Sequence, residues 1–266
     1  MGPPDPARVL CERLDERARL DSLQGGASNR YRASEAGGCK RQIWYRVSGY
    51  LPWPENPNEG MANVVGTVIH DLTRSMFEAN GITIDGIIYN EDATQDETDQ
   101  MQHVLEDGLI LSSRSDGRLG TDTLLEIKSV DQFTFKALEE AYKTGGNAAA
   151  LQWILDKRPY YYGQTMITAE MLGAKMIYLL IVVRDNLRIG LKDRKGVRNC
   201  IIYPFDKAAF EKEVKRFRAV EKARHAGTPP PADYEDGSKP CEYCRFYYLC
   251  HGKKQNLKHP SEAAGE

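Results

Sequence analysis

The sequence predicts an α/β protein in which a mixed β-sheet is flanked by helices, and three observations predict it. Residues 175–183 form an unbroken apolar run with the length of a fully buried strand. Residues 109–111 and 124–130 read as two further strands, joined through a glycine-containing turn. Helical segments precede, separate and follow these strands. This alternation along one chain is typical of α/β folds with a mixed sheet.

Length and composition limit the class of protein. The chain has 266 residues, which suits one large domain or a domain with an appendage. It is 41% hydrophobic and 28% charged, as soluble globular proteins are. No apolar run is long enough to span a membrane, and the N-terminus does not read as a signal peptide, so we expect a cytoplasmic protein. The net charge of −2 argues against indiscriminate binding of nucleic acid through bulk charge.

The N-terminal part of the chain is predicted to be helical. Residues 7–24 have helical character, and a second helix is expected to begin near Ser34, a good N-cap, and to carry Cys39. A proline-rich loop follows at residues 52–57. Apolar residues then recur every three or four positions over residues 60–80, which indicates one amphipathic helix. Gly66 and His70 lie one turn apart on it, and a lone histidine there is more often a surface or core residue than a ligand.

The second half is predicted to alternate strands and helices. A strand is expected at residues 82–89, before the two hairpin arms. Helices are expected at 132–143 and 148–172, separated by Gly145 and Gly146 and interrupted at Pro159. After the buried strand, residues 200–205 form an edge strand, because Pro204 cannot donate to a ladder. A helix at 206–225 and a proline-rich connector at 228–231 follow.

The hairpin carries charges where a core is expected. Side chains alternate along a strand, so Glu126 and Lys128 share one face while Ile127 points to the other. If Asp116 lies opposite Glu126, the three charges converge, and Asp122 is the substitute if the register slips. Two carboxylates about 4 Å apart repel by roughly 4 kcal/mol at an effective dielectric constant of about 20. Such a pair suits Mg²⁺ or Mn²⁺. The alternative is a set of charges solvated on an open sheet face.

Charge is unevenly distributed along the rest of the chain. One basic series covers residues 184–198, and a second lies on the helix at 206–225. Each is an ordinary solvated face unless a nucleic-acid ligand is established on other grounds.

Three cysteines near the C-terminus have the spacing of metal ligands. Cys241 and Cys244 are separated by two residues, and Cys250 follows. A disulfide framework is not expected in a cytosolic chain of this size, so a structural metal or cluster needs a fourth ligand. The candidates for that ligand are Cys39, His251, Cys11 and Cys200, of which Cys200 reads as a small core residue. Zinc suits either set, and four sulfurs also suit an iron-sulfur cluster.

In their joint order these motifs resemble the RecB-type nucleases of the PD-(D/E)XK superfamily, in the branch that carries an iron-sulfur cluster. That branch includes CRISPR-associated exonucleases, the AddAB helicase-nuclease and phage-encoded relatives. The matching pieces span residues 34–250 and are Cys39, Gly66-x-x-x-His70, Ser115-Asp116, Glu126-Ile127-Lys128, Gln164 and Cys241-x-x-Cys244-x5-Cys250. The family continues Gln164 with a tyrosine four residues later, where this chain has Thr168.

The resemblance implies a restriction-endonuclease-like core with a C-terminal cysteine cluster packed on an N-terminal helix. It implies that His70, Asp116, Glu126 and the carbonyl of Ile127 hold Mg²⁺ or Mn²⁺. Lys128 would position the attacking water and Gln164 would belong to the DNA-contacting helix. The resemblance also assigns a [4Fe-4S] cluster to four cysteines: Cys39, Cys241, Cys244 and Cys250.

The leading hypothesis is therefore a metal-dependent DNA exonuclease acting 5′ to 3′ on single-stranded or frayed ends, in recombination, repair, phage replication or CRISPR adaptation. The alternatives are a non-catalytic nucleic-acid-binding module and a zinc-binding structural protein. The expected partners are DNA and recombination or CRISPR adaptation proteins, with an oligomer neither favoured nor excluded. The expected parts are an N-terminal helical arm (1–33), a nuclease core (34–225), a linker with the cysteine segment (226–252) and a disordered tail (253–266).

Overall fold

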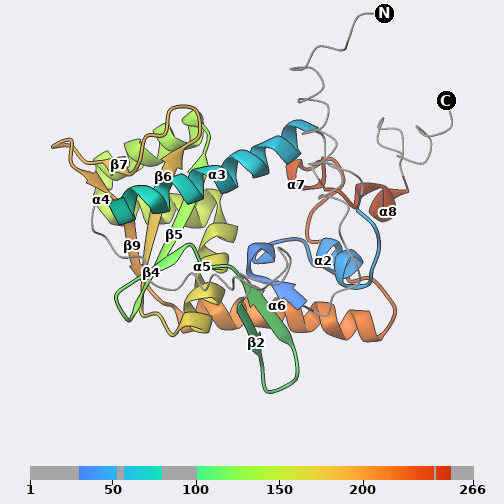
Figure 1. Cartoon of the computed structure of the whole chain (residues 1–266). Coiled ribbons are helices and arrows are strands. Elements are labelled where there is room, and N and C mark those ends of the chain that lie inside the picture. The colour runs from blue at the N-terminus through green and yellow to red at the C-terminus, as the bar shows by residue number, and fades with distance from the viewer. Residues whose placement is uncertain (1–29, 53–56, 80–100, 243, 253–266) are drawn as a thin grey trace, which may run out of the picture. The chain divides into compact units, whose positions relative to one another are not determined.

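The structure is a computed structural model that describes residues 30–52, 57–79, 101–242 and 244–252 (Figure 1). The helix expected at 7–24, the strand expected at 82–89 and the tail after residue 252 lie outside these residues. The described chain divides into two compact units. The first comprises residues 30–37 and 65–216, and the second comprises residues 38–64 and 217–252, in each case as far as they are described.

The first unit is built on a four-stranded mixed sheet. Its strand order is β4 (Gly117–Leu119), β5 (Thr123–Val130), β6 (Met176–Val183) and β9 (Ile201–Pro204). β5 and β6 run parallel, and β4 and β9 pair antiparallel with them. The predicted mixed α/β architecture is confirmed, and β9 is an edge strand as its proline indicates.

A second sheet corrects the prediction for the hairpin. Residues 110–113 form β3 (Ile110–Ser113), which lies between β1 (Arg30–Arg32) and β2 (Met101–Val104). They are therefore not the first arm of the hairpin. That arm is β4, because the chain leaves β3 at Ser113 and begins to pair with β5 only at Gly117. The apolar residues before the turn misled the prediction, since a buried strand in one sheet looks like a buried strand in another. A short pair, β7 (Leu191–Lys192) and β8 (Arg198–Asn199), completes the strands described.

Helices α4 (Gln132–Lys157) and α5 (Pro159–Leu172) connect the parallel strands β5 and β6. Asp131 caps α4, accepting a hydrogen bond from Thr134 N at 2.8 Å. The expected break occurs at Gly145 and Gly146, which have non-helical backbone angles, and Pro159 begins α5. Helices α3 (Pro57–Ala79) and α6 (Lys207–His225) confirm the helices predicted at 60–80 and 206–225.

The alternation along β5 separates core from chemistry. Leu125 and Ile127 pack with Ile69 of α3 and with two residues of β6, Leu180 and Val182. This places the apolar face of β5 in the core of the first unit. The intervening residues, Glu126 and Lys128, consequently face away from that cluster.

The second unit brings the C-terminal segment onto α2 (Lys40–Val47), beside α7 (Lys239–Glu242) and α8 (Tyr247–His251). The Tyr45 ring stacks on Phe246 with centroids 5.7 Å apart, and its hydroxyl donates to Leu249 O at 3.1 Å. The helix expected to begin near Ser34 begins instead at Lys40 with Cys39 as N-cap, because Ser34 lies in a short 3-10 turn (Ala33–Glu35). No helix in the described ranges is long and apolar enough to cross a membrane.

Candidate active site and cysteine pocket

The register of β4 and β5 brings the two carboxylates together. Gly117 pairs with Leu125, so Asp116 stands level with Glu126, as the sequence reasoning required. Asp116 Oδ2 accepts a hydrogen bond from Ile127 N at 2.7 Å. The substitute carboxylate, Asp122, is exposed and does not line the cavity described below.

Lys128 and Gln164 fix the position of Glu126. The Lys128 ammonium donates to Glu126 Oε1 at 2.6 Å and to Gln164 Oε1 at 2.9 Å. Gln164 Nε2 donates in turn to Glu126 Oε1 at 3.0 Å. A glutamine on α5 thus binds both members of the strand pair, and all three side chains are held without the help of solvent.

His70 reaches the same place from α3. Its Nδ1 lies 2.8 Å from Asp116 Oδ1. When Nδ1 carries the proton and donates to the carboxylate, the lone pair is left on Nε2, the form in which histidine binds metals. A Cβ added at Gly66, one turn earlier, would lie 3.4 Å from Ser129 Oγ, so the helix passes close to β5 at this point.

These side chains line one cavity of about 190 Å³. The volume corresponds to roughly six water molecules in the liquid. Sequence reasoning missed part of the lining, since Thr67, Asp71, Arg74 and Arg114 share the cavity with the expected residues. The three residues on α3 could have been predicted from their spacing, because positions 67, 70, 71 and 74 share one helical face.

The surroundings shift the pKa values of the two carboxyl groups in opposite directions. Burial raises the pKa of Asp116, but His70, Lys128 and the Ile127 N–H together outweigh it and hold the pKa below its usual value. Burial and the neighbouring Asp116 charge raise the pKa of Glu126, and Lys128 offsets only part of this. Neighbouring titratable groups whose pKa values are shifted in opposite directions are characteristic of sites that perform acid-base or metal chemistry.

The side chains of the cavity include oxygen and imidazole groups of the kind that bind divalent cations. Glu126 Oε2 is buried and has no hydrogen-bond partner among the described residues. An unpartnered buried carboxylate oxygen is costly unless a cation or donor approaches it. As the side chains lie, no group of three or more His, Cys, Asp or Glu in the described part of the chain is already arranged to hold a metal ion. Here Asp116 is engaged by His70 and Glu126 by Lys128, so a cation would have to compete with these contacts.

Thr168 stands where the resembling family has tyrosine, and it is fully buried. Its hydroxyl donates to Gln164 O at 3.0 Å and lies 2.6 Å from Ser113 Oγ. It therefore packs α5 against β3 and does not reach the cavity. Tyr161 lies closer to the chemistry, with the centroid of its ring 5.4 Å from Lys128 Nζ.

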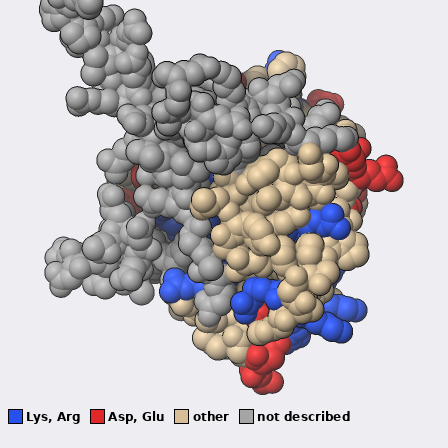
Figure 2. Space-filling view, turned by 90° about the vertical axis from the view of Figure 1, so that its right-hand side faces the viewer, with Lys and Arg blue, Asp and Glu red and all other residues tan. Residues whose placement is uncertain are grey.

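Many residues of the two basic series are engaged with neighbours. On α6, Lys207 pairs with Glu170 at 2.7 Å and with Glu211 at 3.6 Å. In the first series, Arg194 Nε donates to Lys143 O at 2.6 Å, and the Arg188 guanidinium lies 4.7 Å from the Phe135 ring. Figure 2 shows basic and acidic side chains interspersed on the described part of one face. These contacts favour the solvated-face interpretation for much of both series.

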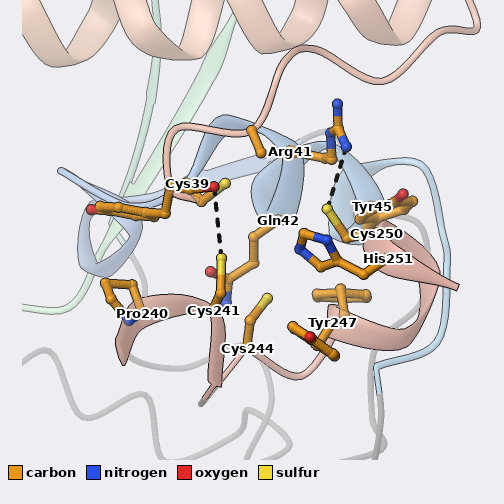
Figure 3. A pocket seen from close by; sticks show the side chains of 13 residues that line it. Cys39, Arg41, Gln42, Tyr45, Pro240, Cys241, Cys244, Tyr247, Cys250 and His251 are labelled. Carbon is orange, nitrogen blue, oxygen red and sulfur yellow. Dashed lines mark hydrogen bonds between the residues drawn. The ribbon is translucent and has the colours of Figure 1, made fainter. Parts of the chain in front are cut away.

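The second unit gathers four thiols around one pocket. Cys39, Cys241, Cys244 and Cys250 line it, together with His251 and Gln42. In Figure 3 their sulfur atoms point toward a common space. Cys200, in contrast, packs against the core cluster of the first unit, as expected for a small core residue. Cys11 lies outside the described residues.

The surroundings of the pocket act on individual side chains that line it. Burial, reinforced by the charges of the three other cysteines, raises the pKa of Cys244 to about 11. Arg41 Nη1 donates to Cys250 Sγ at 3.4 Å. His251 Nε2 is buried and lacks a hydrogen-bond partner among the described residues, so histidine stays a candidate ligand. The pocket has a volume of about 20 Å³, which is room for roughly one water molecule.

The fold and the site together define a class of protein. It is an α/β protein with a mixed sheet, and a central strand of that sheet carries Glu126 and Lys128. Asp116, His70 and Gln164 lie beside them. None of the protein-family models matches the chain, and no curated protein matches its sequence. The solved structure of SSO0001 has the same fold, with a TM-score of 0.52 and 13% identity over 92% of this chain and 98% of that one.

Two structures of the alkaline exonuclease LHK-Exo from Laribacter hongkongensis also align. The TM-scores are 0.40 for the protein alone and 0.41 for its complex with dAMP, at 15% and 16% identity. Both alignments cover 80% of this chain and 93% of the other. At these scores the two likenesses establish neither the fold nor the activity of this chain.

Proposed function

We propose that this protein is a divalent-cation-dependent deoxyribonuclease that hydrolyses phosphodiester bonds. The observation that carries the proposal is the convergence of His70, Asp116, Glu126, Lys128 and Gln164 on one cavity. These five residues come from α3, the two arms of the β4–β5 hairpin and α5. A sheet with merely solvated charges would leave Glu126 and Asp116 in water, whereas both are at most 9% exposed.

Each residue has a task that its contacts support. His70, Asp116, Glu126 and the carbonyl of Ile127 would hold Mg²⁺ or Mn²⁺, which supplies charge neutralisation at the phosphate and a more acidic water. Lys128, fixed by Glu126 and Gln164, places a cationic donor beside the attacking water. Asp116 orients His70 through Nδ1. Hydrolysis joins the water oxygen to phosphorus, breaks the bond from phosphorus to the leaving sugar oxygen, and transfers a proton to that oxygen through the solvent.

The substrate we propose is a single-stranded or frayed DNA end, degraded 5′ to 3′. Tyr160 is 40% exposed, and its neighbour Tyr161 lies against Lys128. Aromatic rings next to a hydrolytic centre can stack on unpaired bases. The sequence resemblance supports roles in recombination, repair, phage replication or CRISPR adaptation.

The test uses end-labelled DNA with Mg²⁺, Mn²⁺ or EDTA. We expect cleavage only with a divalent cation, and about 10³-fold slower cleavage by Lys128→Ala. Lys195→Ala, an exposed lysine outside the cavity, is the matched control and should cleave at the wild-type rate. Cleavage unaffected by Lys128→Ala would remove the catalytic assignment. Substrates blocked at one end then determine polarity.

For the pocket of the second unit we propose a [4Fe-4S] cluster on Cys39, Cys241, Cys244 and Cys250, where it would join segments from both ends of the chain. Its support is the four-thiol lining and the sequence resemblance. Anaerobically purified protein should be brown, with a broad visible absorption band and stoichiometric iron and sulfide. A colourless protein that contains zinc would instead assign the pocket to zinc, with His251 a possible ligand to be tested by substitution.

A further inference from the structure

One cationic side chain of the catalytic cavity has no part in the mechanism above. Arg74 lies on α3 one turn beyond His70 and lines the same cavity. Its side chain is only 7% exposed, although arginine is seldom buried. Among the described residues its guanidinium has one hydrogen-bond partner, Asp71, the residue after His70. Asp71 is itself 55% exposed.

This arrangement is a poor device for stability. Burying a charge costs free energy, and one ion pair with an exposed partner repays only part of that cost. The Arg74–Asp71 pair occupies one nitrogen of a guanidinium that has five N–H donors. None of its other nitrogens is both buried and without a partner, so they are accessible, and Arg74 lines the cavity. The ion pair therefore holds the guanidinium at the cavity and leaves N–H donors available.

The other cations of the cavity differ from Arg74. Lys128 is already bound to Glu126 and Gln164. Arg114 is exposed at the rim, where it suits the DNA backbone outside the cavity. Arg74 is thus a buried hydrogen-bond donor on α3 whose orientation is fixed by Asp71. The planar guanidinium can donate two parallel hydrogen bonds to two oxygens of one phosphate.

We propose that Arg74 is a catalytic residue that donates to a nonbridging oxygen of the scissile phosphate, with Asp71 as its positioning residue. This inference rests on the proposed nuclease function and deepens it. Charge develops on the nonbridging oxygens as the water oxygen bonds to phosphorus and the leaving oxygen departs. A fixed donor stabilises that charge without reorganisation.

The decisive test uses DNA with one phosphorothioate of defined configuration at the scissile linkage. Sulfur replaces one nonbridging oxygen in each diastereomer. For wild type we expect one isomer to be slow in Mg²⁺ and recovered in Mn²⁺, since softer metals accept sulfur better. The other isomer should be slow in both metals, and this slowing should vanish in Arg74→Met. The same slowing in Arg74→Met as in wild type would overturn the proposal.

Steady-state kinetics separate the two arginines. Arg74→Met should lower kcat about 10²- to 10³-fold with little change in KM, and Arg74→Lys should recover part of the loss. Arg114→Met should mainly raise KM. Asp71→Asn should resemble a milder Arg74 variant. If the kcat of Arg74→Met stays within a factor of about three of the wild-type value, Arg74 does not act in the transition state. If Arg74 had only a structural role, the substitution would lower the melting temperature without altering the phosphorothioate effect.

A binding experiment keeps the inference separate from the proposed function. Inorganic phosphate is titrated into the protein in EDTA, where no cleavage occurs. Arg74→Met should bind phosphate about tenfold more weakly than wild type, as loss of a charged hydrogen bond predicts. Arg194→Met, an exposed arginine outside the cavity, is the charge-matched control and should bind normally. Failure of wild type to cleave DNA would remove the nuclease proposal, whereas equal phosphate binding by wild type and Arg74→Met would remove the anion site.

Discussion

The cavity that Asp116, Glu126 and Lys128 line in the first unit and the cysteine pocket of the second differ in what holds their side chains. In the cavity, Lys128 binds Glu126 and His70 binds Asp116, so these side chains hold one another in place. In the pocket, burial raises the pKa of Cys244 to about 11, and the thiol is neutral at physiological pH. The first site is organised by contacts among its own side chains, whereas Cys244 of the second becomes charged when a metal displaces its proton.

This difference predicts different consequences of damage. Removing a group from the cavity should abolish chemistry and leave the fold intact, because Leu125, Ile127 and their partners form a separate apolar core. Removing a thiol from the pocket should loosen the fold, because binding a structural metal contributes directly to folding free energy. The predictions below test this contrast.

The largest effect is expected for Asp116→Asn. The substitution keeps the shape but removes the negative charge that binds His70 and would hold the cation. We expect single-turnover cleavage to fall about 10³-fold. The melting temperature in EDTA should change by no more than a few degrees, since the amide can still accept from Ile127 N. Rapid cleavage by this variant would show that the cation site lies elsewhere.

Cys39→Ser and Cys200→Ser form a matched pair. Both remove a partly buried thiol, but Cys39 lines the pocket and Cys200 packs against the core of the other unit. We expect Cys39→Ser to cost about 3 kcal/mol or more of the free energy of unfolding through loss of metal, and Cys200→Ser about 1 kcal/mol. Urea titrations with metal analysis measure both. Equal losses of unfolding free energy in the two variants would contradict the proposal that a metal in the pocket stabilises the fold by joining distant segments of the chain.

Much of this contrast could be predicted from the sequence. The spacing of Glu126 and Lys128 fixes their shared face in any strand, and the spacing of Cys241 and Cys244 indicates a ligand pair in any loop. The helix at α3 followed from its apolar period, which also placed His70 on a defined face.

Other features depended on tertiary context. The apolar residues of β3 could not reveal which sheet they join, because burial in either sheet requires the same composition. Arg74 was missed because an arginine in an amphipathic helix reads as a solvated residue, and its burial arises only from packing around the cavity. Thr168 departs from the family tyrosine, and only the packing of α5 on β3 shows why a small residue fits.

Glu126→Gln tests the electrostatic state of the cavity through pH. The folded-state pKa of Glu126 lies above the ordinary value of 4.5, so in metal-free protein the folded state retains a proton that the unfolded state releases. Wild type therefore loses stability as pH rises from about 4.5 through the folded-state pKa. Asp116, with a lowered pKa, acts oppositely and only at more acidic pH, where stability is lost as pH falls.

Because Glu126→Gln lacks this titration, its melting temperature relative to wild type should increase between pH 4.5 and pH 8 in EDTA. Cleavage should be reduced at every pH. Melting curves of the two proteins across that range measure the difference. A constant difference would mean that the pKa of Glu126 is not higher in the folded than in the unfolded protein and that burial does not govern its charge.

The smallest effect is expected for Thr168→Val. This variant tests whether a residue of the first unit that packs beside Gln164 affects stability alone or cleavage as well. Because the Thr168 hydroxyl donates to Gln164 O, Ser113 Oγ is the donor in the 2.6 Å contact between the two hydroxyls. Valine has the same shape but cannot accept that hydrogen bond, so the buried Ser113 hydroxyl loses its partner. The expected cost is about 1–2 kcal/mol of unfolding free energy. Cleavage should stay within about twofold of wild type, because Gln164 is still held by Glu126 and Lys128. A large loss of kcat without a comparable loss of stability would instead place Thr168 among the residues that align Gln164 for the reaction.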